Sequence, residues 1–293
     1  MKEDEASSTA YTVLQGQLLS AINPAYKGLV SEETVIVGKQ ILTASTEGRK
    51  RLKQLNSKAT RFFAPLVEKI LMPGITLHYV LRKQFIEDAT CEGIKNGATQ
   101  VVNIGAGFDT LAWRLHKKYP EVNFIEIDHP ATNKQKAKAL FDKSPANLHL
   151  LPVDLSQEDT GKTLEKFPFF DPDRKTIFIC EGVLMYLAES EVVSLFVTLK
   201  NVTNQPINFI FTCVEPIDSP NNNVGFLLRI YLKFKSEPLN WLLEQKNMKA
   251  FLDTQNYEIK DIAARDQLQK RYLKNIKHGE LHHGEYLVFT VSK

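Results

Sequence analysis

The sequence predicts an α/β protein in which a mainly parallel sheet is covered by helices on both faces. Between residues 100 and 216, short apolar runs alternate with segments of helical periodicity. These runs are apolar throughout rather than at every second position, which is typical of strands buried on both faces. A length of 293 residues and a hydrophobic content of 43% are enough for a substantial core.

The first hundred residues are expected to be mostly helical. Apolar residues recur at helical spacing within residues 8–22. Residues 62–94 carry the same periodicity but contain Pro73-Gly74, a pair that breaks helices. We therefore expect two helices in that stretch, one on each side of this pair.

The rest of the chain is divided into strands and helices by the same periodicity rules. The predicted strands lie within residues 100–107, 122–128, 148–155, 175–182, 207–216, 257–262 and 284–292. The predicted helices between them lie within residues 108–120, 129–141 and 190–202. Phe108 is expected to share a buried face of the first of these helices with Leu111 and Leu115.

Glycines or acidic residues stand where four successive strands end. The first strand runs into Gly105-Ala106-Gly107, the second ends in Asp128, the third in Asp154 and the fourth in Glu181. Parallel sheets bind ligands beyond the carboxyl ends of their strands. Asp128 follows the glycine turn by 21 residues, which suits a carboxylate that accepts hydrogen bonds from both hydroxyls of a ribose. The pattern predicts a nucleoside-binding crevice.

The charges at these strand ends favour S-adenosylmethionine over a nicotinamide dinucleotide. A dinucleotide fingerprint has a third glycine where this chain has Thr110, and Asp109 before it would repel a pyrophosphate. S-adenosylmethionine has no phosphate; it has a sulfonium, an ammonium and one carboxylate. An acidic crevice suits the two cations, and Arg82 is a candidate to bind the carboxylate.

Four segments, "NIGAGFDTLAWRL", "FIEIDHP", "LPVDL" and "CEGVLMYL", resemble the leucine carboxyl methyltransferase family in their order and spacing. The bacterial members of this family include small-molecule and polyketide O-methyltransferases. The resemblance covers roughly residues 60–215. It implies a class I methyltransferase fold, which has a seven-stranded sheet with its last strand antiparallel, together with a helical cap that closes over the substrate.

The resemblance also implies a role for individual residues. Tyr186 would lie on the substrate side, and Arg82 would bind the cofactor carboxylate, although members often have Arg-Thr where this chain has Arg82-Lys83. The implied cofactor contacts are Gly105, Ala106, Gly107 and Glu181 for the methionine portion, Asp128 for the ribose, Asp154 and Leu155 for the adenine, and Arg82 for the carboxylate.

Composition argues against several other classes of protein. The formal net charge is only +3, which gives no reason to expect a nucleic-acid partner. Three widely spaced cysteines without a CxxC pair indicate a reducing compartment and neither disulfides nor a metal site. The amino-terminal residues lack a secretory pattern, and no apolar run reaches the roughly 20 residues of a membrane span. We expect a cytoplasmic protein without stable membrane insertion.

Two groups of charged residues and one apolar segment outside the motifs are interpreted as follows. His278, His282 and His283 are interpreted as surface residues, and the lysines of residues 134–138 as a solvated helix face. The apolar segment 224–243 is expected to be a lid over the acceptor, a buried helix pair or a face that rests on a membrane.

We expect a single domain over residues 1–293. Its parts would be amino-terminal helices with part of the cap (1–95), a cofactor-binding core (96–215), a cap insertion (216–250) and closing strands (251–293). The expected function is an S-adenosylmethionine-dependent O-methyltransferase for a small-molecule hydroxyl or carboxyl group, the acceptor being apolar or aromatic. The alternatives are a methyltransferase for protein C-terminal carboxyl groups and a non-catalytic cofactor-binding partner or sensor. No general base is assigned, and the oligomeric state stays open.

Overall fold

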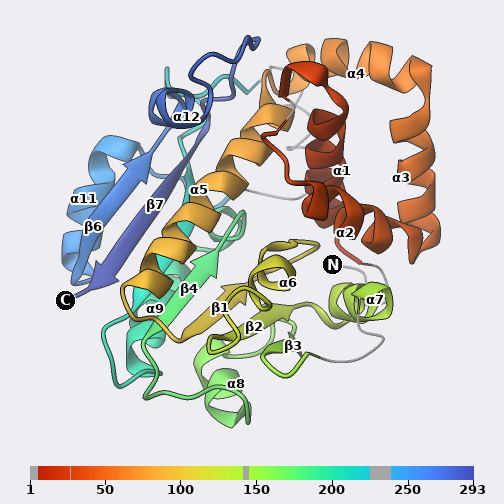
Figure 1. Ribbon diagram of the computed structural model, residues 1–293. Coiled ribbons are helices and arrows are strands. Elements are labelled where there is room, and N and C mark those ends of the chain that lie inside the picture. The colour runs from red at the N-terminus through yellow and green to blue at the C-terminus, as the bar shows by residue number, and fades with distance from the viewer. Residues whose placement is uncertain (1–5, 27, 141–144, 225–238) are drawn as a thin grey trace.

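A computed structural model describes residues 6–26, 28–140, 145–224 and 239–293 of the chain (Figure 1). Its centre is a seven-stranded sheet of order β3-β2-β1-β4-β5-β7-β6. β7 runs antiparallel to both of its neighbours, and the other pairs are parallel, as predicted. The strands are β1 (Gln100–Ile104), β2 (Asn123–Asp128), β3 (Leu148–Pro152), β4 (Thr176–Cys180), β5 (Asn208–Val214), β6 (Tyr257–Ala263) and β7 (Glu285–Ser292).

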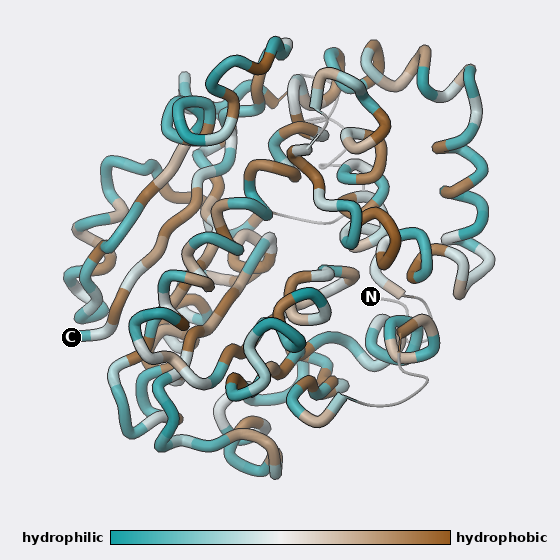
Figure 2. Tube along the Cα trace, viewed as in Figure 1, coloured by the Kyte–Doolittle hydropathy of each residue, from teal (hydrophilic) through white to brown (hydrophobic). Residues whose placement is uncertain are grey.

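Each central strand is buried on both faces because successive side chains point to opposite sides of the sheet. In β1, Val101 points into one hydrophobic cluster while Val102 and Ile104 point into another. Brown, hydrophobic stretches therefore run along the strands in Figure 2. The continuous apolar runs of the sequence are explained by this two-sided burial.

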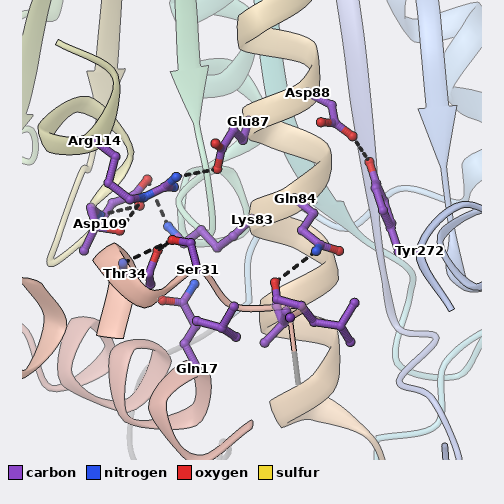
Figure 3. Close-up of a pocket in the computed structure, with 15 residues that line it drawn as sticks. Gln17, Ser31, Thr34, Lys83, Gln84, Glu87, Asp88, Asp109, Arg114 and Tyr272 are labelled. Carbon is purple, nitrogen blue, oxygen red and sulfur yellow. Dashed lines mark hydrogen bonds and ion pairs between the residues drawn. The ribbon is translucent and has the colours of Figure 1, made fainter. Parts of the chain in front are cut away.

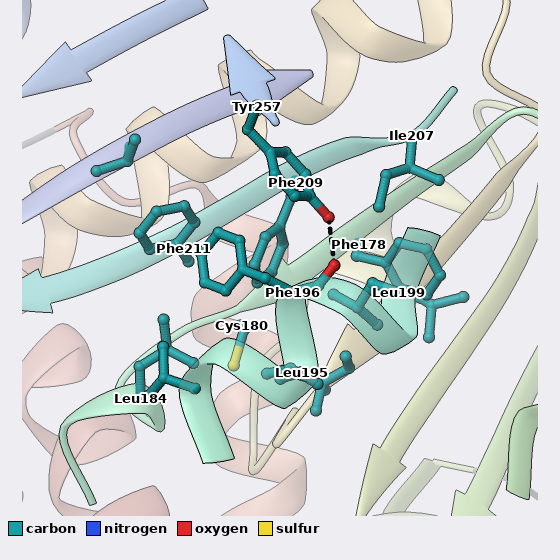
Figure 4. Packing of buried hydrophobic residues seen from close by; sticks show 14 of the residues in the cluster. Phe178, Cys180, Leu184, Leu195, Phe196, Leu199, Ile207, Phe209, Phe211 and Tyr257 are labelled. Atoms are coloured by element: carbon teal, nitrogen blue, oxygen red, sulfur yellow. Dashed lines mark hydrogen bonds between the residues drawn. The ribbon is translucent and has the colours of Figure 1, made fainter. Parts of the chain in front are cut away.

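One face of the sheet is covered by α8 (Thr160–Lys166), α9 (Glu189–Asn201) and α11 (Gln245–Thr254). Phe196 of α9 lies at the centre of this layer, with its ring 5.0 Å from the Phe209 ring and 5.2 Å from the Tyr257 ring, both edge to face. The Tyr257 hydroxyl donates a hydrogen bond of 2.9 Å to the Phe196 carbonyl oxygen (Figure 4). The buried hydroxyl is thus satisfied within the core.

The other face is covered by α5 (Ile75–Lys95), α6 (Leu111–Leu115) and α12 (Arg265–Tyr272). α5 crosses this face diagonally in Figure 1. Leu81 and Phe85 of α5 are almost completely buried. Arg82 and Lys83 lie between these two residues in the sequence, and the packing of α5 thereby holds them near the carboxyl ends of the strands.

The amino-terminal helices form a third layer beside the sheet. They are α1 (Ser8–Ile22), a 3-10 turn η1 (Pro24–Tyr26), α2 (Glu32–Thr43), α3 (Thr46–Asn56) and α4 (Lys58–Leu71). Each α-helix begins after a serine whose hydroxyl accepts a backbone N–H bond, and these serines are Ser7, Ser31, Ser45 and Ser57. The predicted break at Pro73-Gly74 is confirmed, since Gly74 has a φ of +74° and a Cβ there would collide with the backbone of Glu280.

The remaining helices agree with the sequence only in part. α7 (Pro130–Leu140), α9 and the 3-10 turn η2 (Leu184–Tyr186) follow predicted strands. The prediction for Phe108 is wrong, because α6 begins only at Leu111. Phe108 packs instead on Tyr11 of α1, with ring centroids 4.7 Å apart. It therefore belongs to the cluster that joins the amino-terminal helices to the sheet.

Part of one prediction lies outside the described residues. The apolar segment 224–243, and with it much of the predicted cap insertion 216–250, includes residues 225–238. Before residues 225–238, the Asn223 side chain donates a hydrogen bond to the carbonyl oxygen of Leu281. After them, the Asn240 side chain donates one to the carbonyl oxygen of Tyr186. Among the helices that the structure describes, none combines the length and the apolar character of a membrane span.

Candidate functional site

The carboxyl ends of β1, β2 and β4 lie side by side, where the sequence predicts the cofactor site. Gly105, Gly107 and Gly182 all have positive φ, at +70°, +53° and +67°. This backbone conformation is costly for other residues. A Cβ on Gly105 would lie only 2.5 Å from the Val183 side chain, so this glycine also allows the β4 loop to pack closely.

Asp128, at the end of β2, is buried and bound to the glycine turn. One carboxylate oxygen accepts a hydrogen bond of 2.6 Å from the Gly107 N–H, and the other accepts one of 2.8 Å from the His129 N–H. Burial raises the pKa of Asp128 in spite of these bonds. The Thr132 side chain also acts on this carboxylate as a hydrogen-bond donor, and acceptor capacity that remains on the two oxygens can serve a ligand.

Asp154 and Leu155, after β3, are at the neighbouring strand end. One oxygen of Asp154 accepts bonds from the Ser156 N–H (3.0 Å) and hydroxyl (2.6 Å), and these bonds lower its pKa. The other oxygen lies 4.0 Å from His129 Nε2. Leu155 packs against the hydrophobic core. The second and third strand ends are thus linked through His129.

Asp109 occupies the amino terminus of α6. Its Oδ1 accepts bonds from the N–H groups of Thr110 (2.6 Å) and Leu111 (3.1 Å), and its Oδ2 lies 3.0 Å from Lys83 Nζ. Burial acts to raise the pKa of Asp109, but the charge and hydrogen bond of Lys83 together with the charges of Lys136 and Arg114 outweigh it, and the pKa is lowered to about 2. The helix donors that would hold a pyrophosphate in a dinucleotide site are already bound by this carboxylate.

Arg82 and Lys83 of α5 lie within a chain of buried ion pairs. We call this set the ion-pair chain; its members are His78, Arg82, Lys83, Asp109, Glu181 and Glu285. Arg82 lies between two carboxylates, with Nε 2.7 Å from Glu181 and Nη1 2.9 Å from Glu285. Lys83 Nζ lies 2.7 Å from Glu181 as well as 3.0 Å from Asp109. His78 Nε2 lies 2.7 Å from Glu285.

These pairs shift the pKa values of Glu285 and Arg82. Burial acts to raise the pKa of Glu285, but the adjacent Arg82 guanidinium lowers it well below its ordinary value. Although burial opposes it, the two carboxylates raise the pKa of Arg82. The 2.7 Å contact between Arg82 Nε and Glu181 is not aligned as a hydrogen bond, so both atoms keep bonding capacity for a third partner.

A pocket of about 270 Å³ opens beside the Lys83–Asp109 pair (Figure 3). Arg114 spans it to bind Glu87 at 2.7 Å, and the Tyr272 hydroxyl donates to Asp88 at 2.7 Å. The lining residues come from α1, the loop before α2, α5, α6 and the end of α12. They are Gln17, Gly28, Leu29, Val30, Ser31, Thr34, Val80, Lys83, Gln84, Glu87, Asp88, Asp109, Thr110, Arg114 and Tyr272.

Tyr186 lies at the end of η2, just beyond the β4 strand end, and is partly exposed. Tyr79 of α5 faces the same region, with its ring 5.1 Å from the Arg82 guanidinium. Burial raises the pKa of Tyr79 to about 12, so it is a neutral phenol at physiological pH. The structure therefore places Tyr79 beside Arg82, a tyrosine that the sequence did not indicate.

The sequence missed half of the ion-pair chain and misjudged two neighbouring groups. His78, Lys83 and Glu285 were not predicted to take part. The prediction that His282 is a surface residue is wrong, since it is 3% exposed with its ring 5.2 Å from that of His78. Lys136 does not belong to a solvated face, because its Nζ is buried 2.5 Å from Glu126. The available signal for Glu285 was an acid at the first position of an otherwise apolar strand.

Comparison with known proteins identifies relatives of this chain. Residues 30–200 match the sequence profile of the family described as leucine carboxyl methyltransferase. A Mycobacterium tuberculosis protein, provisionally named an S-adenosyl-L-methionine-dependent methyltransferase, is 32% identical over 186 residues, which are 62% of this chain and 50% of that protein. A Caenorhabditis briggsae protein, provisionally named leucine carboxyl methyltransferase 1, is 29% identical over 169 residues, 48% of this chain and 50% of that protein.

Among solved structures, a provisionally assigned methyltransferase from Thermobifida fusca superposes with a TM-score of 0.58 at 14% identity. The superposition covers 87% of this chain and 94% of that chain. At this identity the likeness concerns the fold alone. The chain spans about half the length of the curated relatives it matches.

Proposed function

Because the chain belongs to the leucine carboxyl methyltransferase family, we propose that it is an S-adenosylmethionine-dependent O-methyltransferase for a small-molecule hydroxyl or carboxyl group. Its fold is that of the class I methyltransferases, as predicted. The observation that carries the proposal is the arrangement at the ends of β1, β2 and β4, where Asp109 occupies the phosphate-binding donors while Asp128 and Glu181 supply negative charge.

The residues present suit S-adenosylmethionine in three respects. Asp128 is a buried carboxylate with a raised pKa and remaining acceptor capacity, which two ribose hydroxyls would stabilise. Arg82 Nε and Glu181 Oε1 are buried atoms without an aligned hydrogen bond, and they suit the carboxylate and the ammonium of the methionine portion. Asp154 and Leu155 offer a polar and an apolar edge to the adenine at the next strand end.

The cofactor supplies an electrophilic methyl group on a sulfonium. The part of the protein is mainly to hold that methyl in line with the acceptor oxygen, since positioning alone can supply much of the acceleration. Asp128 and Arg82 would fix the two ends of the cofactor. Glu181 would balance its positive charge. Tyr186, exposed beyond β4, would orient the acceptor from the substrate side.

The acceptor sets how much further chemistry the protein must supply. A carboxylate is ionised at neutral pH and needs no base, whereas a hydroxyl needs a general base or a phenol of lowered pKa. Tyr79 does not suit the role of base, because its own pKa is raised to about 12. A carboxyl acceptor therefore requires no general base from the described residues.

Methylation of a protein C-terminal carboxyl group is the second candidate. It is favoured by the family to which the chain belongs, described as leucine carboxyl methyltransferase. The Caenorhabditis briggsae relative carries a leucine carboxyl methyltransferase name. An apolar or aromatic small molecule stays our first choice of acceptor, and the two classes are separated by the assay below.

The test combines calorimetry with a transfer assay. S-adenosylmethionine should bind the purified chain, whereas NAD should not, because Asp109 repels its pyrophosphate. Radiolabelled methyl transfer is then measured to carboxylic acids, phenols and peptides with free C-terminal carboxyl groups. Transfer to peptides alone would replace the first candidate by the second. Binding without transfer to any acceptor would favour the non-catalytic sensor, and preference for NAD would overturn the cofactor assignment.

A further inference from the structure

α4 carries a row of large apolar side chains on its outer surface. Within its fourteen residues, none is buried. Five large hydrophobic side chains, spaced three or four residues apart along one side of the helix, are about half exposed or more. They are Phe62 (77%), Phe63 (54%), Leu66 (56%), Val67 (50%) and Ile70 (49%), and we call them the α4 stripe.

The opposite side of α4 attaches the helix to the protein. Thr60, Ala64 and Glu68 are half-buried. The Glu68 carboxylate accepts a 2.7 Å hydrogen bond from the hydroxyl of Thr76 at the start of α5. The helix is therefore oriented by polar contacts on its inner side. The α4 stripe faces away from the rest of the molecule, at whose edge α4 lies in Figures 1 and 2.

Positive charge surrounds the α4 stripe. Residues 46–72, which comprise α3, α4 and the residue after it, contain seven basic and two acidic residues, a net charge of +5, while the whole chain has only +3. Lys58 lies one turn before Phe62 on the same side of the helix, and Lys69 lies three residues after Leu66. Both lysines, with Lys50 and Lys53 of α3, are exposed.

We propose that α4, supported by α3, binds the surface of an anionic lipid bilayer. An apolar stripe with aromatic residues, flanked by lysine and arginine, is typical of helices that lie in the plane of a membrane. Lysine side chains at the edge of the stripe can keep their charges among lipid phosphates while their aliphatic parts follow the apolar side chains. A nucleic acid would use the charges but would leave Phe63, Val67 and Ile70 in water.

The test measures binding of the full chain to vesicles by co-sedimentation. One set contains phosphatidylcholine alone, and the other contains equal parts of phosphatidylcholine and phosphatidylserine. We expect binding to the anionic set only, weakened by added salt because the charge contribution is screened. Phe62→Ser with Leu66→Ser should lower the partition constant about tenfold or more, which corresponds to the loss of large buried apolar side chains.

Two further variants make the result specific. Val197→Ser on α9, whose side chain is 41% exposed outside the α4 stripe, should bind vesicles like the wild type. Lys58→Glu with Lys69→Glu should weaken binding to anionic vesicles while leaving the apolar side chains intact. The melting temperature of each variant is recorded, and we expect no change because all the altered side chains are exposed.

Three outcomes would overturn the proposal. The first is equal binding to both vesicle sets or to neither. The second is an unchanged partition constant in both double variants. The third is a wild-type dimer that becomes a monomer in Phe62→Ser with Leu66→Ser and does not bind vesicles, which would make the α4 stripe an interface between two copies of the chain. None of these measurements depends on methyltransferase activity.

Discussion

Asp128 lies at the end of β2 and Asp109 just before α6, and their surroundings shift their pKa values in opposite directions. Both carboxyl groups are buried, which acts to raise each pKa. Asp109 contacts the Lys83 ammonium at 3.0 Å, and its pKa falls to about 2. Asp128 accepts bonds from backbone N–H groups and also feels the charge of Lys136, but these do not offset burial, and its pKa stays raised. Direct contact with an ammonium, which Asp109 has, thus makes the difference between the two buried acids.

The ion-pair chain and the Asp128 side are therefore expected to have different tasks. Every carboxylate of the ion-pair chain contacts a cationic side chain of the protein, so these pairs should contribute mainly to folding stability. The Asp128 side, which we call the ribose end, retains a carboxylate that a ligand can stabilise further, so it should contribute mainly to cofactor affinity. Variants on the two sides should therefore differ in which measurement they change.

The largest effect is expected for Arg82→Met. Removal of the guanidinium leaves Glu181 and Glu285 buried without their shared cation, and breaking a buried pair in this way typically costs about 3–5 kcal/mol. The free energy of unfolding in urea measures the loss. Lys249→Met, which breaks an exposed pair with Asp253, is the control and should be close to wild type. Equal stability of the two variants would show that the ion-pair chain does not stabilise the fold.

Glu285→Gln should have a smaller effect that depends on pH. The amide keeps the shape and can still accept a bond from Arg82, so we expect a loss of about 2–3 kcal/mol near neutral pH. Since the pKa of Glu285 is lowered in the folded state, its stabilisation is present above the unfolded value of about 4.3 and is lost as the pH falls below it. The stability difference between wild type and variant should accordingly shrink on acidification. A difference that is constant with pH would contradict this.

The sheet and its strand ends were predictable because they depend on local patterns. Two-sided burial makes the β1 and β4 segments apolar throughout, and a glycine or an acid after such a run marks the strand end. The positions of Gly105, Asp128 and Glu181 at adjacent strand ends follow from the parallel order of the sheet. Their roles toward a cofactor stay predictions.

The partners within the crevice could not be predicted, because they come from distant parts of the chain. Glu285 is 207 residues from His78, and the closing strand pair brings them to 2.7 Å. The sequence predicts a solvated helix face for Lys134, Lys136 and Lys138, and of these Lys134 and Lys138 are exposed. Only the packing of α7 on β2 turns the Lys136 side chain toward Glu126. Helical periodicity gives the face of a residue, but not which face meets the sheet.

Asp128→Ala tests the ribose end by binding rather than stability. Loss of a charged acceptor should weaken S-adenosylmethionine binding by about 1.5–3 kcal/mol. Ribose hydroxyls stabilise the ionised form, so binding should release protons from wild type and weaken as the pH falls through the raised pKa of Asp128. Calorimetry in buffers of different ionisation enthalpy measures this release. Its persistence in Asp128→Ala would assign the proton to another group.

The smallest effect is expected for Lys83→Thr, which replaces the ammonium by a neutral hydroxyl group. Glu181 keeps Arg82, and Asp109 keeps the N–H groups of Thr110 and Leu111, so neither acid loses all its partners. We expect a loss of about 1–2 kcal/mol in the free energy of unfolding, the scale of one charge-assisted hydrogen bond. The lowered pKa of Asp109 gives stability that is present above about pH 4 and is lost toward pH 2. Without Lys83 this acid-dependent part should diminish. A loss as large as that of Arg82→Met would mean that Lys83, and not Arg82, is the cation on which the ion-pair chain depends.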